Sequence, residues 1–246
     1  MAGHSKWHNI QHRKGAQDAK RGKIFTKLIK EIVISAKIGG GRIENNHSLK
    51  IIIDKALAVN MRRNTIENAV KRGNGDFDGN NYEKIRYEGY SLGGTAIMVD
   101  CLSDNRNRTI SDIRHAFLKH GGNLGRDGSV SYLFTKQGFI SFDTGNENQI
   151  MEIALDEGAQ DIITNDDDSI DVITTPEDFF TIKDVLTTSG LEPSHAEVTM
   201  EPASRVELNL SDAEKFMKLI DHLEDLDETK KIYHNADISD KVMVRL

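Results

Sequence analysis

The chain has 246 residues, of which 37% are hydrophobic and 29% are charged, and only three are proline. This length and composition are typical of an ordered protein with two or three domains. No stretch of 18 uncharged apolar residues occurs, and the first ten residues are polar and basic, so we expect neither a transmembrane helix nor a cleaved secretory signal. Cys101 is the single cysteine, which excludes an intramolecular disulfide and favours a reducing cytoplasm.

The net charge of −7 is divided unevenly along the chain. Residues 1–75 contain 16 Lys and Arg against 5 Asp and Glu, a net charge of +11, whereas residues 76–246 contain 16 against 34, a net charge of −18. This asymmetry favours a nucleic-acid-binding module joined to an acidic body. The alternative is that the basic part docks on the acidic part of the same molecule.

Residues 1–75 predict three amphipathic helices with short loops, the pattern of a small bundle. In residues 19–37, apolar side chains recur at helical spacing beside a face of lysines, and the glycines at 39–41 end this helix. Residues 49–57 predict the second helix. A short third helix is predicted to end at Gly73, where the Gly-, Asn- and Asp-rich linker 73–81 begins.

After this linker the pattern changes to mixed α and β. Strands are predicted at 83–90 and 95–102, joined by a hairpin turn at 91–94. A helix follows that ends at Gly121, and another strand is predicted at 130–135. This block is too small to complete a sheet and cover it.

Residues 138–202 predict the order strand, helix, strand, strand, helix, strand, which is typical of a ferredoxin-like unit. Its second helix is predicted to begin at Pro176. The rest of the chain predicts a strand, a helix and a strand. These last strands are expected at 205–209 and 230–235, with Ser211 and Glu214 as the capping box of the helix between them.

The two incomplete blocks are expected to pair, with the residues between them inserted as a separate domain. The predicted fold class is a multidomain α+β protein with an N-terminal helical bundle domain. Two α/β sandwich domains follow, the last ferredoxin-like and inserted in the middle one. The predicted domains are residues 1–75, residues 82–136 together with 204–240, and residues 137–203.

The first thirty residues carry eight Lys and Arg against one acid, with a tryptophan and three histidines interleaved. Cations neutralise phosphates and release counterions, and aromatic rings can stack on exposed bases. An arm of charge +7 with several glycines is costly to hold compact, which favours a polyanionic partner over a solvated arm without one. The predicted nucleic-acid-binding residues here are Lys6, Trp7, His12, Arg13, Lys14, Lys20, Arg21, Lys23, Lys27 and Lys30.

The segment 104–109 joins a predicted strand to a predicted helix and has two interpretations. Arg106 and Arg108 could contact phosphate at the start of the helix, or the segment is a turn in which Asn107 or Thr109 caps it. The glycine-rich segment 121–128 resembles a phosphate-cradling loop only loosely. It lacks the lysine and the Ser or Thr of a P-loop, so a flexible connection is favoured.

Metal and catalytic chemistry are not predicted. His4, His8 and His12 have helical spacing, but no carboxylate or thiolate accompanies them, so polar or stacking contacts are favoured over a metal site. The three aspartates 166–168 match no EF-hand spacing and are expected in a hairpin turn. Nothing marks Cys101 as a nucleophile, and no G-x-S-x-G, H-E-x-x-H or dinucleotide fingerprint occurs. We therefore expect no enzyme activity, no cofactor and no small-molecule substrate.

A series of longer motifs runs in order along nearly the whole chain. They are residues 1–7 (MAGHSKW), 12–14 (HRK), 18–23 (DAKRGK), 87–90 (YEGY), 104–109 (DNRNRT), 121–125 (GGNLG), 128–130 (GSV) and 223–227 (LEDLD). In these motifs the chain closely resembles the YebC/PmpR family, whose relatives include a mitochondrial translational activator of cytochrome oxidase. Two segments depart from the family pattern: residues 60–65 (NMRRNT) lack its proline and add a cation, and residues 91–94 (SLGG) lack the proline of its hairpin.

The resemblance implies three domains and a cytoplasmic, non-enzymatic protein. Bacterial members are mostly described as probable transcriptional regulators that bind DNA. Our first hypothesis is therefore a nucleic-acid-binding regulator of gene expression that resembles them. The alternative, which other members favour, is a ribosome-associated translation factor that binds ribosomal RNA and relieves stalling at proline runs. Stacking by Trp7 and the histidines suits RNA slightly better than duplex DNA.

Overall fold

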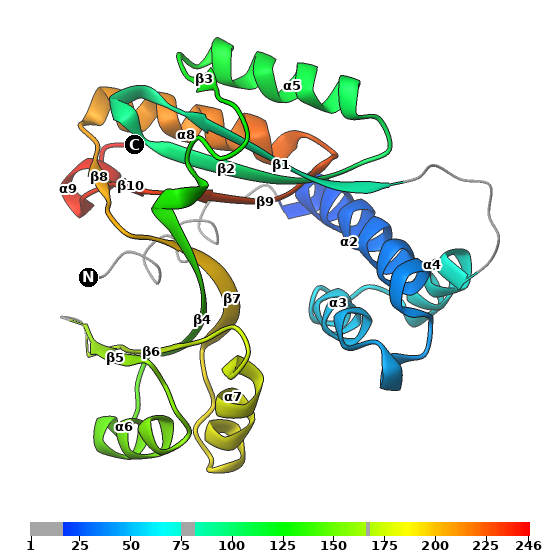
Figure 1. Ribbon diagram of the computed structural model, residues 1–246, viewed down its shortest axis with the longest axis vertical. Coiled ribbons are helices and arrows are strands. Elements are labelled where there is room, and N and C mark those ends of the chain that lie inside the picture. Colours follow the sequence, from blue (N-terminus) through cyan, green and yellow to red (C-terminus); the bar gives the residue numbers. More distant parts are fainter. Residues whose placement is uncertain (1–16, 75–81, 166–167) are drawn as a thin grey trace.

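The computed structural model describes residues 17–74, 82–165 and 168–246, without the side chains of residues 17–23 and 240. A group of helices stands beside two four-stranded sheets that carry helices of their own (Figure 1). All neighbouring strands in the two four-stranded sheets are antiparallel. The molecule is therefore an α+β protein with an N-terminal helical region, as the sequence predicts.

The N-terminal helices pack around one apolar core that includes Ile32, Leu49 and Ala56. Asn46 links two of these helices. Its side chain accepts a hydrogen bond from the Leu49 amide (3.0 Å) and donates to the carbonyls of Ser35 (2.8 Å) and Gly40 (2.7 Å). The elements are α2 (Gln17–Gly39), the short 3-10 helix η1 (Ile43–Asn45), α3 (His47–Ala58) and α4 (Arg63–Asn74).

Gly73 does not end α4, contrary to the sequence prediction. It lies where α4 meets α2, and a Cβ atom placed on it would be 2.4 Å from the Val33 carbonyl oxygen and 2.6 Å from the Ala36 Cβ. A glycine is needed here because the two helix backbones approach so closely.

We expect Gly73→Ala to force the two helices apart and to lower the free energy of unfolding by about 1–3 kcal/mol. Alanine is a better helix former than glycine by about 1 kcal/mol, so helix propensity favours the variant. A loss of stability would therefore come from the close contact between the helices. Urea denaturation measures the difference, with Lys71→Ala on the exposed side of α4 as the control. A stabilised Gly73→Ala variant would contradict the close contact.

The first sheet has the strand order β3-β1-β2-β9, and α5 and α8 cover one of its faces (Figure 1). The predicted hairpin is present: the turn between β1 and β2 has Gly93 and Gly94 at φ +71° and +79°. β9 comes from the last part of the chain and pairs with β2. The elements are β1 (Glu83–Tyr90), η2 (Leu92–Gly94), β2 (Ala96–Ser103), α5 (Arg106–Lys119), β3 (Asn123–Leu124), α8 (Leu210–Asp225) and β9 (Thr229–His234).

The second sheet has the order β5-β6-β4-β7, with α6 and α7 packed on it around Ile140, Ile150 and Ile182. In Figure 1, β4 and β7 are the strands of this second sheet that extend up towards the first sheet. The elements are η3 (Ser131–Leu133), β4 (Phe134–Phe142), α6 (Glu147–Asp156), β5 (Asp161–Thr164), β6 (Ile170–Thr174), α7 (Phe179–Thr188) and β7 (His195–Pro202). The remaining elements are the parallel pair β8 (Val206–Glu207) and β10 (Ala236–Asp237), and α9 (Asp240–Met243).

Several predicted element boundaries are wrong. The predicted strand 130–135 contains η3, and β4 begins only at Phe134. Pro176 does not begin α7: residues 176–178 form a turn, and the Thr175 hydroxyl accepts a hydrogen bond from the Asp178 amide (3.0 Å). That side-chain bond holds residues 176–178 in a turn ahead of α7, which begins at Phe179.

The capping box at the start of α8 is also wrong. The N-cap is Asn209, whose side chain accepts a hydrogen bond from the Asp212 amide (3.0 Å). Asparagine is among the best N-cap residues, and with Asn209 as the cap the helix begins at Leu210, two residues earlier than a cap at Ser211 would allow. The predicted strand 205–209 is correspondingly reduced to β8.

Candidate nucleic-acid interface

Most of the predicted basic arm lies outside the described residues. Lys6, Trp7, His12, Arg13 and Lys14 belong to this part, as do the three histidines considered as metal ligands. Lys20, Arg21 and Lys23 lie on α2, but their side chains are not described. Of the ten residues predicted in the arm and on α2, only Lys27 and Lys30 can therefore be placed with their contacts.

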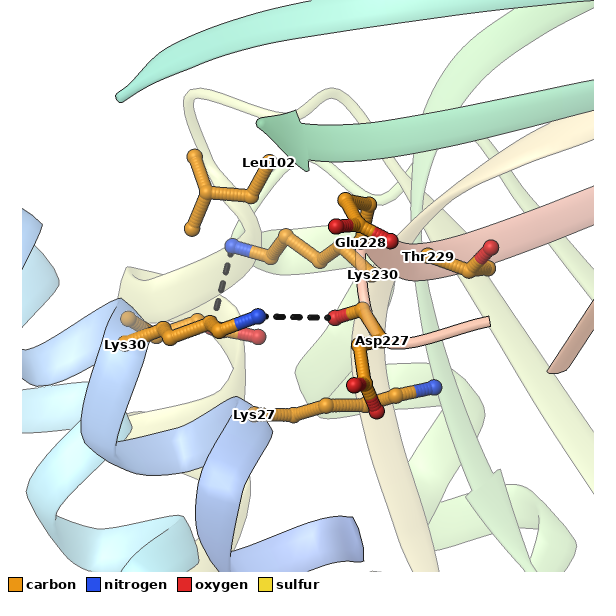
Figure 2. A pocket seen from close by; sticks show the side chains of 8 residues that line it. Lys27, Lys30, Leu102, Asp227, Glu228, Thr229 and Lys230 are labelled. Atoms are coloured by element: carbon orange, nitrogen blue, oxygen red, sulfur yellow. Dashed lines mark hydrogen bonds and ion pairs between the residues drawn. The ribbon is translucent and has the colours of Figure 1, made fainter. Parts of the chain in front are cut away.

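Lys27 and Lys30 contact the segment where α8 ends and leads into β9. Figure 2 shows Lys30 directed at Asp227 of this segment. The Lys27 Nζ donates a hydrogen bond to the Glu224 carbonyl (2.7 Å), and the Lys30 Nζ donates one to the Asp227 carbonyl (3.4 Å). Glu224 lies in the last turn of α8, where the carbonyls lack partners within the helix and carry the negative end of its dipole, so its carbonyl is a good site for a cation. Asp227 follows the end of the helix.

An ion pair lies beside these two hydrogen bonds. Glu31 Oε2, one residue after Lys30 on α2, is 3.0 Å from Lys230 Nζ on β9. On this part of α2, Lys27 and Lys30 therefore bind backbone carbonyls of the body, and Glu31 binds a lysine of the body. In this arrangement Lys27 and Lys30 are used within the molecule, which corresponds to the docking alternative raised by the charge asymmetry.

Arg106 and Arg108 at the start of α5 have different environments. Arg108 forms ion pairs with Asp104 (2.7 Å) and Glu228 (2.7 Å), so its charge is matched internally. The side chain of Arg106 is exposed. The helix cap is neither Asn107 nor Thr109 but Asn105, whose side chain accepts a hydrogen bond from the Arg108 amide (3.1 Å).

The glycine-rich loop after α5 holds an internal carboxylate. Glu88 on β1 is only 5% exposed and accepts hydrogen bonds from the amides of Gly128 (3.0 Å), Val130 (2.7 Å) and Ser131 (2.8 Å). Burial by itself raises the pKa of this carboxyl, but the three amides outweigh it and hold the pKa below its usual value. Glu88 therefore holds the end of this connection, residues 128–131, against β1.

The role of Glu88 was not predicted from the sequence, although a signal was available. Within the motif 87–90, an acidic residue occurs in a strand whose central residues are buried. A buried carboxylate requires hydrogen-bond donors, and a nearby glycine-rich loop supplies free amides.

The described helical region also exposes cations that were not predicted as site residues. Arg62 and Arg63 precede or begin α4, and Lys71 and Arg72 lie near its end. All four side chains are exposed, and none forms an ion pair with another described residue. The departure from the family pattern at residues 60–65 was the available signal for the first two.

Of the remaining candidates for chemistry, the structure describes Cys101 and Asp168. Burial raises the pKa of the Cys101 thiol to about 12, so it stays protonated near neutral pH. Of the three aspartates, only Asp168 is described, with φ +63° in the turn between β5 and β6. Within residues 17–74, 82–165 and 168–246, no group of three or more His, Cys, Asp or Glu could hold a metal ion. None of the helices described is both long and apolar enough to cross a bilayer.

Comparison with known proteins gives matches over almost the entire chain. Residues 5–76 match the model of the TACO1/YebC protein N-terminal domain, and residues 82–236 match that of the TACO1/YebC second and third domain. A "probable transcriptional regulatory protein" of Vesicomyosocius okutanii is 68% identical over 245 residues, which is 100% of both chains. The "probable transcriptional regulatory protein YebC" of Escherichia coli is 55% identical over 246 residues, again 100% of both.

A solved structure shares the arrangement of elements. The crystal structure of a conserved hypothetical protein from Aquifex aeolicus superposes with a TM-score of 0.79 at 39% sequence identity. The match covers 92% of this chain and 95% of that chain, so it includes the helical region and both sheets.

Proposed function

The chain belongs to the TACO1/YebC family, and from that premise we propose that it is a nucleic-acid-binding regulator of gene expression. The observation that carries the proposal is the concentration of positive charge in residues 1–75, a net +11 on a chain whose total is −7. The names of the bacterial relatives, probable transcriptional regulatory proteins, support the same function.

The proposed contact surface is the basic arm, continued by the exposed cations of α4. Lys6, Arg13, Lys14, Lys20, Arg21 and Lys23 neutralise phosphates, while Trp7 and His12 stack on bases. Arg62, Arg63, Lys71 and Arg72 extend the surface along α4. Phosphate contacts position a protein without specifying sequence, so we expect weak sequence preference from this surface.

The alternative is a translation factor that binds ribosomal RNA and relieves stalling at proline runs. One observation favours it: the arm combines cations with one tryptophan and three histidines, and stacking of this kind reads single-stranded RNA better than duplex. In both versions the partner is nucleic acid, and the ribosome is the larger assembly in the second.

For the organisation of the chain we propose three domains with the boundaries predicted above. The separate apolar cores of the helical region and of the two sheets support this division. The order β5-β6-β4-β7, with α6 and α7 in the two crossovers, supports a ferredoxin-like inserted domain. We further propose a cytoplasmic protein without catalytic activity, cofactor or resident metal.

Competitive co-sedimentation tests the two functions. The purified full chain is mixed with ribosomes and a molar excess of duplex promoter DNA near physiological salt, and the ribosome pellet is assayed. Retention in the pellet despite the DNA supports the translation function. Loss from the pellet, with the protein on the duplex, supports transcriptional regulation. A protein found on neither would contradict nucleic-acid binding altogether.

A further inference from the structure

We propose that nucleic acid and the C-terminal end of α8 compete for Lys27 and Lys30, so that the contact between α2 and α8 is a closed state that nucleic-acid binding opens. The inference rests on the proposed function and adds a regulation to it. It starts from the hydrogen bonds of Lys27 with Glu224 and of Lys30 with Asp227, and from the ion pair of Glu31 with Lys230. Figure 2 shows the second and third of these contacts as dashed lines.

The charges around the closed contact keep a polyanion out of it. Residues 223–228 (LEDLDE) contain four acids at the end of α8, and Asp227 and Glu228 line the same cleft as Lys27 and Lys30. A phosphate brought to either lysine in this position would approach these carboxylates as well as the negative end of the helix dipole. The two lysines therefore cannot serve the body and a nucleic acid at once.

The contact is built so that it can open. The core of the helical region, around Ile32 and Leu49, and the core of the first sheet, around Ile97 and Phe216, share no buried residue. The links between α2 and the segment from the end of α8 to the start of β9 include two hydrogen bonds donated by lysines and one ion pair, whose Lys230 side chain is 38% exposed. Polar contacts of this kind are screened by salt and readily exchanged for others.

A second contact joins the helical region to the rest of the body. The rings of His47 on α3 and Phe180 near the start of α7 pack edge to face, with centroids 4.4 Å apart. Opening would separate this pair too. One aromatic contact is small beside a shared apolar core, so movement of the helical region remains accessible.

A charge reversal at Lys230 separates this proposal from simple electrostatics. Lys230→Glu places a carboxylate opposite Glu31 and weakens the closed state without altering Lys27 or Lys30. It also makes the protein more negative by two charges, so electrostatics alone predicts weaker binding to nucleic acid. Competition predicts tighter binding, by about two- to fivefold, because a larger fraction of the molecules is open.

Three further variants, at Lys215 on α8, Glu31 on α2 and Lys230 on β9, serve as controls. Lys215→Glu, an exposed lysine on α8 that does not line the cleft, makes the same change in charge and is expected to weaken binding slightly. The swap of Glu31→Lys with Lys230→Glu restores an ion pair at unchanged net charge and is expected to return the affinity to that of the wild type. Lys230→Gln, which removes the pair without repulsion, is expected to give a smaller gain.

The readouts are fluorescence anisotropy with a labelled single-stranded RNA oligonucleotide and with its duplex DNA counterpart, and the radius of gyration from small-angle X-ray scattering. The full-length wild type should expand on binding, and Lys230→Glu should be expanded without ligand. If the wild type binds neither probe, the proposed function fails and the competition with it. If the wild type binds but Lys230→Glu binds no tighter than Lys215→Glu, only the competition is overturned. The same holds if binding leaves the radius of gyration unchanged.

Discussion

Glu88→Ala is expected to lower the free energy of unfolding by about 3 kcal/mol, a large share of the stability of a typical domain. The carboxylate is buried and accepts hydrogen bonds from three backbone amides of the loop 128–131. Its removal leaves these amides without their acceptor and takes away the group that holds the loop against β1. Urea denaturation near neutral pH measures the loss. Glu83→Ala, at the exposed start of the same strand, is the control and should change stability by less than about 0.5 kcal/mol.

The pH dependence of the same site has a definite sign. Because the pKa of Glu88 is lower in the folded protein than in the unfolded chain, the ionised carboxylate contributes its stability above the unfolded pKa, about 4.3. That contribution is lost as pH falls through the folded pKa. The stability difference between the wild type and Glu88→Gln should therefore be constant near neutral pH and shrink below about pH 4. A difference that grows on acidification would contradict an ionised Glu88.

Reversal of three lysines on and before α2 is the second change with a large expected effect. In the combination of Lys14→Glu, Lys20→Glu and Lys23→Glu, we expect affinity for RNA or DNA to fall by about a hundredfold or more near physiological salt. The slope of log affinity against log salt should become shallower by about two to three, since each lysine that meets a phosphate contributes nearly one counterion. Lys27 is kept as it is, because its contact with α8 would confuse the result.

A matched variant separates local contact from total charge. Lys136→Glu, Lys215→Glu and Lys218→Glu alter the net charge equally at exposed positions of the acidic body. Their combination should reduce affinity only slightly and leave the salt slope close to that of the wild type. Equal effects of the two triple variants would show that the basic arm is not the contact.

The sequence alone determined the elements that depend on neighbouring residues. The 3.6-residue period of α2, the hairpin of β1 and β2, and the strand and helix order of residues 138–202 all follow from side chains a few positions apart. The charge division of the chain is likewise a property of the sequence, and the proposed nucleic-acid partner rests on it. Boundaries were less well predicted where a single side chain decides them, as Thr175 does before α7 and Asn209 does before α8.

Only the tertiary structure decided which of these side chains meet across the chain. Gly73 reads locally as a helix end, but the backbone of α2 makes it a packing position. Glu88 and its amides lie 40 to 43 residues apart, and Lys27 and Glu224 lie 197 residues apart. No local pattern specifies such pairs, because the packing of distant segments brings them together. A lysine has the same helical spacing whether it contacts a phosphate or the end of another helix. The sequence could therefore identify the lysines of α2 as a charged face, and the folded chain determined that Lys27 and Lys30 contact its own acidic body.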